Sequence, residues 1–68
     1  MAGMSLKALR VNKGLTQAQA AEKLEISKDT LSNYERGKSF PDVPVIRRIE
    51  TVYGVGYNDI IFLPKNND

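Results

Sequence analysis

Four polar side chains share one side of a short helix that the sequence predicts between Ser27 and Arg36. The period of 3.6 residues turns Leu31 and Tyr34 inward. The residues left facing outward are Lys28, Asp29, Ser32 and Asn33. Lysine can donate to guanine O6 and N7, asparagine can pair with adenine N6 and N7, and aspartate can accept from the cytosine amine. The pattern therefore predicts a helix that could contact base edges in a DNA groove.

Each of these side chains also has an ordinary structural explanation. Asp29 falls in the first turn, where a carboxylate interacts favourably with the helix dipole and the free amides. Lys28 and Asn33 could belong to a solvated helix face. For all three residues, the residue pattern leaves both explanations open.

A second helix precedes this one across a single tight corner. Its apolar residues Ala20, Ala21 and Leu24 follow the helical period, which breaks phase at Ile26. Thr16 and Gln19 have the spacing of a capping box, in which each side chain bonds the backbone amide of the other. Ser27 can cap the following helix, and Gly37 can end it in a left-handed conformation. We therefore expect a helix-turn-helix formed by residues 17–24 and 28–36.

The stretch LTQAQAAEKLEISKDTLSNYERGKSFPD resembles the phage-repressor-like (Cro/repressor, XRE-type) helix-turn-helix transcription regulators. The resemblance extends from Leu6 to about Leu63. Its most specific parts are Leu15-Thr16-Gln17, Ala21, Ile26, Tyr34-Glu35-Arg36-Gly37-Lys38 and Pro41. One departure is Glu25, where the family usually has glycine in the turn. A left-handed glutamate there would cost roughly 1–2 kcal/mol.

The resemblance implies an all-α, compact five-helix lambda-repressor-like domain that binds double-stranded DNA through helices two and three. Gln17 and the amides that begin helix two could bind a phosphate, since a helix N-terminus attracts anions. By the same resemblance, Lys38 and Ser39 could bind another, with an ordinary exposed loop lysine as the alternative for Lys38. The expected DNA-binding residues are Gln17, Ser27, Lys28, Asp29, Thr30, Ser32, Asn33, Lys38 and Ser39.

Arg10 and Glu35 match positions that form a partly buried ion pair in relatives of this family. Such a pair would tie helix one to the recognition helix and would have a structural role. The alternative is that the two residues are independent surface charges.

The remaining helices are predicted from capping residues at their starts and from glycine at their ends. Ser5 can cap a first helix that runs through Lys13, before Gly14. Asp42 can cap a fourth helix, which tolerates Pro44 in its first turn and ends at Gly54. Its predicted buried stripe comprises Val45, Ile46, Ile49, Val52 and Tyr53. A fifth helix is expected over residues 57–63, and no strand is expected.

One domain over residues 5–63 accounts for nearly all of the chain. Residues 1–4 are expected to be disordered or left over from expression, and residues 64–68 to form a polar tail. Tyr57, Ile61 and Phe62 are candidates for a homodimer contact, because a chain this small cannot bury every large side chain near its end. Ile60 is placed in the monomer core.

The amino-acid composition also bears on the classes of function that the chain could have. The 68 residues contain no cysteine and no histidine, which removes the usual thiolate and imidazole ligands of a metal site and the usual general base. The formal net charge is +2, but residues 1–40 have seven basic and four acidic residues, whereas residues 41–68 have three and four. This positive half contains the helix-turn-helix, although a mixed surface would look similar. No long apolar run or export leader is present, so we expect a cytoplasmic protein without membrane contact.

The sequence favours a DNA-binding regulator that represses, or occasionally activates, from an inverted-repeat operator. An antitoxin or a restriction-modification controller would use the same fold. A protein-interaction module without DNA binding is a weaker alternative that rests on Asp29 alone. An enzyme is weaker still, because Glu22 and Glu25 resemble a solvated charged edge more than a catalytic pair. No cofactor, metal or small-molecule ligand is expected.

Overall fold

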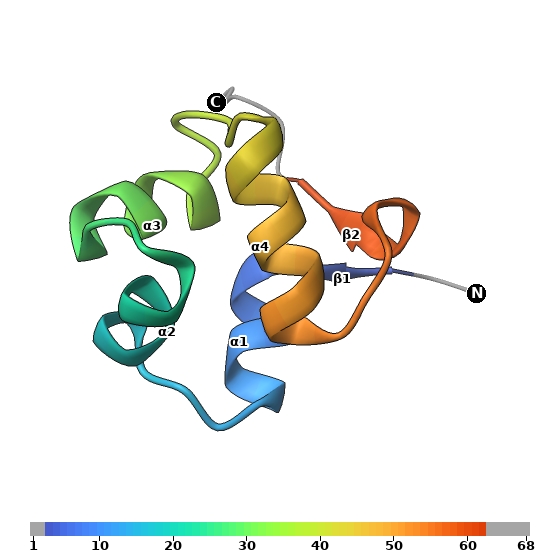
Figure 1. Ribbon diagram of the computed structural model, residues 1–68, viewed down its shortest axis with the longest axis horizontal. Coiled ribbons are helices and arrows are strands. Elements are labelled where there is room, and N and C mark those ends of the chain that lie inside the picture. Colours follow the sequence, from blue (N-terminus) through green and yellow to red (C-terminus); the bar gives the residue numbers. More distant parts are fainter. Residues whose placement is uncertain (1–2, 63–68) are drawn as a thin grey trace.

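The computed structural model describes residues 3–62 and consists of four α-helices and a minimal sheet (Figure 1). The helices are α1 (Leu6–Asn12), α2 (Gln17–Leu24), α3 (Lys28–Glu35) and α4 (Val43–Tyr53). Strand β1 (Met4–Ser5) precedes them, and a 3-10 turn, η1 (Tyr57–Asp59), leads into β2 (Ile60–Ile61). The expected polar tail lies outside the described residues.

Each α-helix starts at the residue that the sequence predicts. Side-chain oxygens of Ser5, Thr16, Ser27 and Asp42 accept from backbone amides in the first turn of the helix that each begins. The capping box at Thr16 is complete, because the Gln19 side chain accepts from the Thr16 amide at 2.9 Å. These caps divide a continuous polypeptide into four short helices at defined positions.

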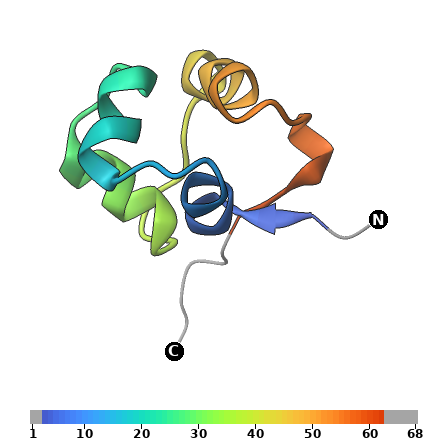
Figure 2. The same ribbon diagram turned by 90° about the horizontal axis from the view of Figure 1, so that it is seen from below.

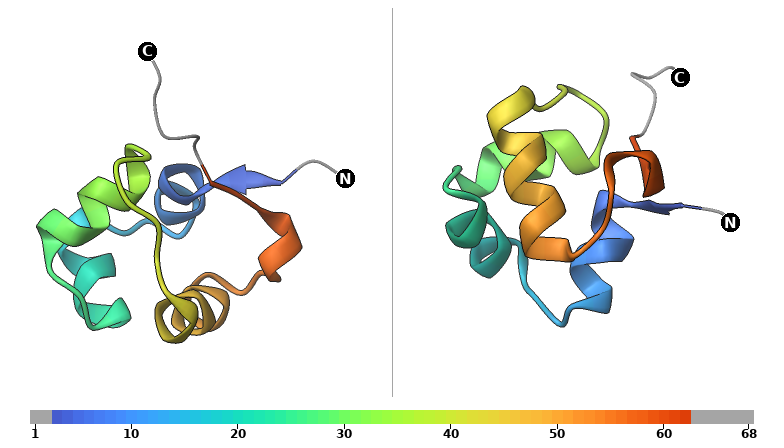
Figure 3. Two further views of the ribbon diagram at one scale, coloured as in Figure 1. Left: turned by 90° about the horizontal axis from the view of Figure 1, so that it is seen from above. Right: turned by 45° about the vertical axis from the view of Figure 1, so that its right-hand side comes forward.

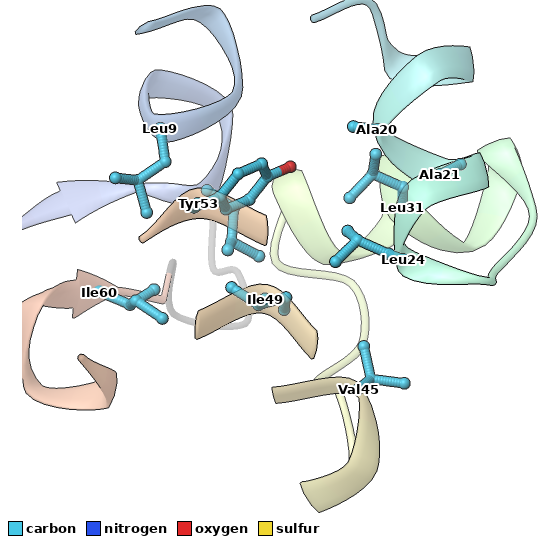
Figure 4. Close-up of a cluster of buried hydrophobic side chains, with 10 residues drawn as sticks. Leu9, Ala20, Ala21, Leu24, Leu31, Val45, Ile49, Tyr53 and Ile60 are labelled. Atoms are coloured by element: carbon cyan, nitrogen blue, oxygen red, sulfur yellow. The ribbon is translucent and has the colours of Figure 1, made fainter. Parts of the chain in front are cut away.

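The core lies between the four helices and β2 (Figure 4). Leu24, Leu31 and Ile49, from three different helices, are its largest fully buried side chains. The predicted stripe of α4 is buried at Val45, Ile49 and Tyr53, whereas Ile46 and Val52 are only partly buried. Leu15, Ile26 and Tyr34 pack against the margin of this core. Both helices of the helix-turn-helix are anchored in it, α2 by Leu24 and α3 by Leu31.

The expected fifth helix is not present in the described residues. Tyr57–Asp59 form a single 3-10 turn, and Ile60–Ile61 pair in parallel with Met4–Ser5 (Figure 2). Tyr57, Ile60 and Ile61 fit a helical period, but a run this short also fits a strand. Ile60 points into the core and Ile61 outward, which is the alternation of a strand, and β-branched side chains favour that geometry. The fold is therefore mostly helical, not purely helical.

Met4, expected in a disordered segment, is half of strand β1. Gly3 precedes it, and a Cβ at this position would overlap the carbonyl oxygen of Asp59. The close approach of the two backbones thus requires glycine. The short sheet closes the end of the core opposite α2 and α3 (Figure 3).

Glu25 occupies the left-handed conformation, with φ 62° and ψ 40°, and ends α2. It is the only non-glycine residue with positive φ among residues 3–62. The turn therefore adopts the left-handed conformation without glycine and carries the strain of a side chain in this region.

A buried ion pair connects α1 to α3. The Nε atom of Arg10 lies 2.7 Å from Oε2 of Glu35, and its Nη2 donates to Oε1 at 3.2 Å. The side chains are 11% and 3% exposed, so water screens the pair weakly. Nη1 of Arg10 also donates to the Leu15 carbonyl, which fixes the chain between α1 and α2. Hydrogen bonding to Glu35 raises the pKa of Arg10 above its ordinary value.

Tyr53 places its hydroxyl group in the core without a hydrogen-bond partner among residues 3–62. Burial, reinforced by the negative charge of Glu35, raises the pKa of Tyr53 to about 12. The positive charge of Arg10 opposes this shift. The phenol is therefore held in its neutral form in the folded protein.

Arg10→Ala should destabilise the domain by about 3–5 kcal/mol, because it leaves the Glu35 carboxylate buried without its partner. The double variant Arg10→Met/Glu35→Leu should recover most of this loss, since it removes both charges. Urea unfolding of the two variants and the parent measures both effects. Equal stability of Arg10→Ala and the parent would show that the pair has no structural role.

Tyr53→Phe should leave the domain as stable at pH 7, or more stable by up to about 1 kcal/mol, because the lost hydroxyl has no partner. An acid whose pKa is raised on folding stabilises fully below its unfolded pKa, here 10.0, and this contribution is lost as the pH rises through about 12. The parent should thus lose more stability than Tyr53→Phe between these pH values. Parallel alkaline losses in thermal unfolding would contradict this account.

Candidate nucleic-acid interface

Helix α3 lies at the outer edge of the molecule and packs against α1 and α2 (Figure 1). Leu31 and Glu35 are buried on its inner side, and Lys28 and Asp29 are exposed on its first turn. Ser32 and Asn33 are partly exposed on the following turn. Four polar side chains thus lie on the side of α3 that the core does not use.

Ser27 and Thr30 are brought together at the beginning of α3. The Ser27 hydroxyl accepts from the Thr30 amide at 3.0 Å and donates to the Thr30 hydroxyl at 2.7 Å. Capping accordingly occupies part of the hydrogen-bonding capacity of Ser27. Thr30 Oγ1 keeps its own proton for another acceptor.

Arg36 is a candidate that the sequence reasoning missed. Its Nη2 donates to Oδ1 of Asn33 at 3.2 Å, and Arg36 itself is exposed at the end of α3. This bond directs the Asn33 carbonyl oxygen toward the helix C-terminus. The available signal was the spacing of three residues between Asn33 and Arg36, which places the two side chains together on a helix.

Gln17 connects the first residue of α2 to the end of α3. Its Nε2 donates to Oε1 of Glu35 at 3.0 Å, and the same oxygen accepts from Arg10. The Gln17 side chain is therefore held in place by a residue that is itself fixed in the core. The remaining N–H of its amide group and its own backbone amide stay available to a phosphate oxygen.

Lys38 and Ser39 are exposed in the loop that follows α3. Gly37, at φ 77°, turns the chain there, and the Lys38 amide bonds the Asn33 carbonyl at 2.9 Å. Lys28, the first residue of α3, and Lys38, in the loop after it, consequently lie at opposite ends of the helix. The predicted residues form one strip along the helix, with Gln17 joined to it at the end of α3 through Glu35.

Burial raises the pKa of Tyr34, and the negative charge of Asp42 adds to the shift. Tyr34 is partly buried and packs against the core from α3. Its phenol is therefore neutral under ordinary conditions and contributes no charge to this strip.

An aromatic cluster lies where the loop after α3 meets β2. The ring centroids of Phe40 and Phe62 are 4.6 Å apart, and those of Tyr57 and Phe62 are 5.8 Å apart. Phe40, Tyr57 and Ile61 are 58%, 47% and 49% exposed. Of the residues named as dimer candidates, Tyr57 and Ile61 are about half exposed, whereas Phe62 is partly buried. Ile60 is buried in the core, and Phe40 was not foreseen.

Two further findings concern the described part of the chain only. None of its helices combines the length and hydropathy that crossing a bilayer requires. No three residues of the types that bind metals gather there in a way that could hold an ion.

Comparison with known proteins identifies the family of the chain. Residues 6–60 match the helix-turn-helix family. The HTH-type transcriptional regulator ImmR of Bacillus subtilis is 43% identical over 53 residues, which are 78% of this chain and 42% of that protein. The HTH-type transcriptional activator BcrR of Enterococcus faecalis is 34% identical over 56 residues, 82% of this chain and 28% of that protein.

The antitoxin PezA of Streptococcus pneumoniae is 38% identical over 61 residues, 90% of this chain and 39% of that protein. The chain thus spans less than half the length of each of these three relatives. The match covers all four α-helices and the exposed strip along α3. The chain therefore belongs to the XRE-type helix-turn-helix family of DNA-binding transcription regulators.

Proposed function

We propose that this chain is a sequence-specific regulator that inserts α3 into the major groove of double-stranded DNA. The observation that carries the proposal is the strip of polar side chains on the outer side of α3, in a domain of this family. Lys28 can donate to guanine and Asn33 can pair with adenine, with the Asn33 amide oriented by Arg36. Asp29 either accepts from cytosine or stabilises the first turn.

The flanking groups position the helix on the DNA backbone. Gln17 at one end of α2, and Lys38 and Ser39 after α3, offer donors to phosphates on either side of the groove. Because Gln17 is held by Glu35, the backbone contact and the recognition helix keep a constant separation. Ser27, Thr30 and Ser32 complete the interface as hydroxyl donors and acceptors.

We propose further that the protein binds an inverted-repeat operator as a homodimer and represses transcription in the cytoplasm. The support for dimerisation is the cluster of Phe40, Tyr57 and Phe62, in which Phe40 and Tyr57 are exposed, together with the exposed side chain of Ile61 on β2. Phe40 lies next to Lys38 and Ser39 in the same loop, so pairing two such clusters would set the two α3 helices at a defined spacing. Half-sites one helical turn apart, about 34 Å, fit such a dimer.

The likeness to an antitoxin favours a second candidate within DNA binding. An antitoxin of this kind would use the same α3 strip to bind DNA. The name of another relative, an activator, shows that the fold alone does not decide the sign of regulation.

Selection of bound duplexes from a random pool should enrich an inverted repeat. Against that duplex, Lys28→Ala and Asn33→Ala should each cost about 1–3 kcal/mol and relax one base position in each half-site. Lys38→Ala should instead weaken binding to all sequences and lower the salt dependence of log K by about 0.9 per half-site. Fluorescence anisotropy over a range of salt concentrations measures these effects.

Lys7→Ala is the matched control, because Lys7 is an exposed helical lysine outside the strip. It should leave base preference unchanged. Enrichment of no sequence, or equal effects of Lys7→Ala and Lys28→Ala, would contradict recognition by α3.

Ile61→Asp should convert the dimer into a monomer, because it places a charge in the apolar contact. Val11→Asp is its control, since Val11 is 58% exposed on α1 and lies outside the cluster. Sedimentation velocity at increasing protein concentration distinguishes the two variants. A parent protein that stays monomeric at high concentration and on DNA would refute the dimer.

A further inference from the structure

A groove between α2 and α4 collects positive charge outside the α3 strip. Its first part has a volume of about 450 Å³ and is lined by Lys13, Leu15, Lys23 and Val52. The three contributing segments are α2, α4 and the end of α1 with the chain that follows it. The two helices pack directly against each other, and Figure 2 shows them side by side.

A second part, of about 330 Å³, continues along α4 and shares Lys23 and Val52 with the first. Its other lining residues are Glu25, Arg47, Arg48 and Thr51. The whole groove is thus lined by four cationic side chains and a single carboxylate. None of its lining residues belongs to α3 or to the loop that follows α3.

The groove has defined walls. Arg48 donates from Nε to the Leu24 carbonyl at 2.8 Å, which fastens α4 to the end of α2. A Cβ placed on Gly54 would lie 3.9 Å from Nζ of Lys13, so this ammonium group sits against the C-terminal end of α4. Its position there is favoured by the negative end of the helix dipole.

Three of the cations form no ion pair in the described part of the chain. Lys13, Lys23 and Arg47 are exposed, and none of them has a carboxylate within salt-bridge distance among residues 3–62. A concave surface on which charges of one sign predominate concentrates the potential and attracts a ligand of opposite charge, and here four cations outnumber the single carboxylate of Glu25.

The floor of the groove is apolar. Leu15 and Val52 are only partly buried and present their remaining surface between the lysines. A phosphate backbone would leave these two side chains without a partner. A protein segment that carries an apolar side chain between carboxylates matches both the floor and the rim.

We propose that the groove between α2 and α4 binds an acidic segment of a partner protein, with an apolar side chain over Leu15 and Val52 and carboxylates beside Lys13, Lys23 and Arg47. This site lies on elements other than the proposed recognition helix. A partner could therefore bind while α3 contacts DNA.

Selection from a displayed library of random peptides against the full chain tests the proposal. Acidic peptides with a shared apolar position should be enriched, and Lys23→Glu or Arg47→Glu should lower their affinity at least about tenfold. Lys7→Glu makes the same charge change on α1, outside the groove, and should lower affinity less than about twofold. Circular dichroism of each variant verifies that it is folded.

Enrichment of no common pattern, or equal losses with Lys7→Glu and Lys23→Glu, would overturn the proposal. Binding of the groove to the DNA backbone would also overturn the proposal, and it would change the salt dependence of duplex binding. In that case Lys23→Glu and Arg47→Glu, unlike Lys7→Glu, would lower the salt dependence of duplex binding by about 0.9 per lost contact. The proposal predicts that all three variants bind the selected duplex with the salt dependence of the parent, changed by much less than the loss of one contact.

Discussion

The buried bond between Arg10 and Glu35 is the interaction on which the arrangement of the helix-turn-helix depends. It joins α1 to the last turn of α3, and the same carboxylate accepts from Gln17 at the beginning of α2. Arg10 also bonds the chain between α1 and α2. One guanidinium and one carboxylate therefore determine where three helices meet. A surface pair would be worth little, but burial makes the loss of either partner costly.

Local signals in the sequence were sufficient to predict most of this framework. Ser5, Thr16, Ser27 and Asp42 cap the helices as expected, because a cap depends on residues within one turn. Glu25 illustrates the limit of local preference. Its side chain disfavours the left-handed conformation, yet the packing of α2 against α3 imposes the turn. The last described element was mispredicted, because Tyr57, Ile60 and Ile61 fit both periods and pairing with Met4, more than fifty residues away in sequence, favoured the strand.

The candidate site likewise has residues that the sequence could predict and residues that it could not. Outward positions of α3 follow from the helical period, so Lys28 and Asn33 could be named from the sequence. The bond between Arg36 and Asn33 is local and could have been found by the same rule. The groove between α2 and α4 could not have been predicted from the sequence, because Lys13, Lys23 and Arg47 come from three separate segments. Arg47 also belongs to the half of the chain with net negative charge. Phe40 joins Phe62 only through tertiary packing.

The structure thus separates three surfaces on one small domain: a polar strip on α3, an apolar cluster beside it and a basic groove between α2 and α4. The central claim is that the α3 strip is the DNA interface. Amide chemical-shift mapping of the full chain with its selected duplex tests this claim most directly. The account predicts the largest changes at Gln17, at residues 28–33 and at residues 38–39. Changes confined to Lys13, Lys23 and Arg47, with α3 unaffected, would contradict it.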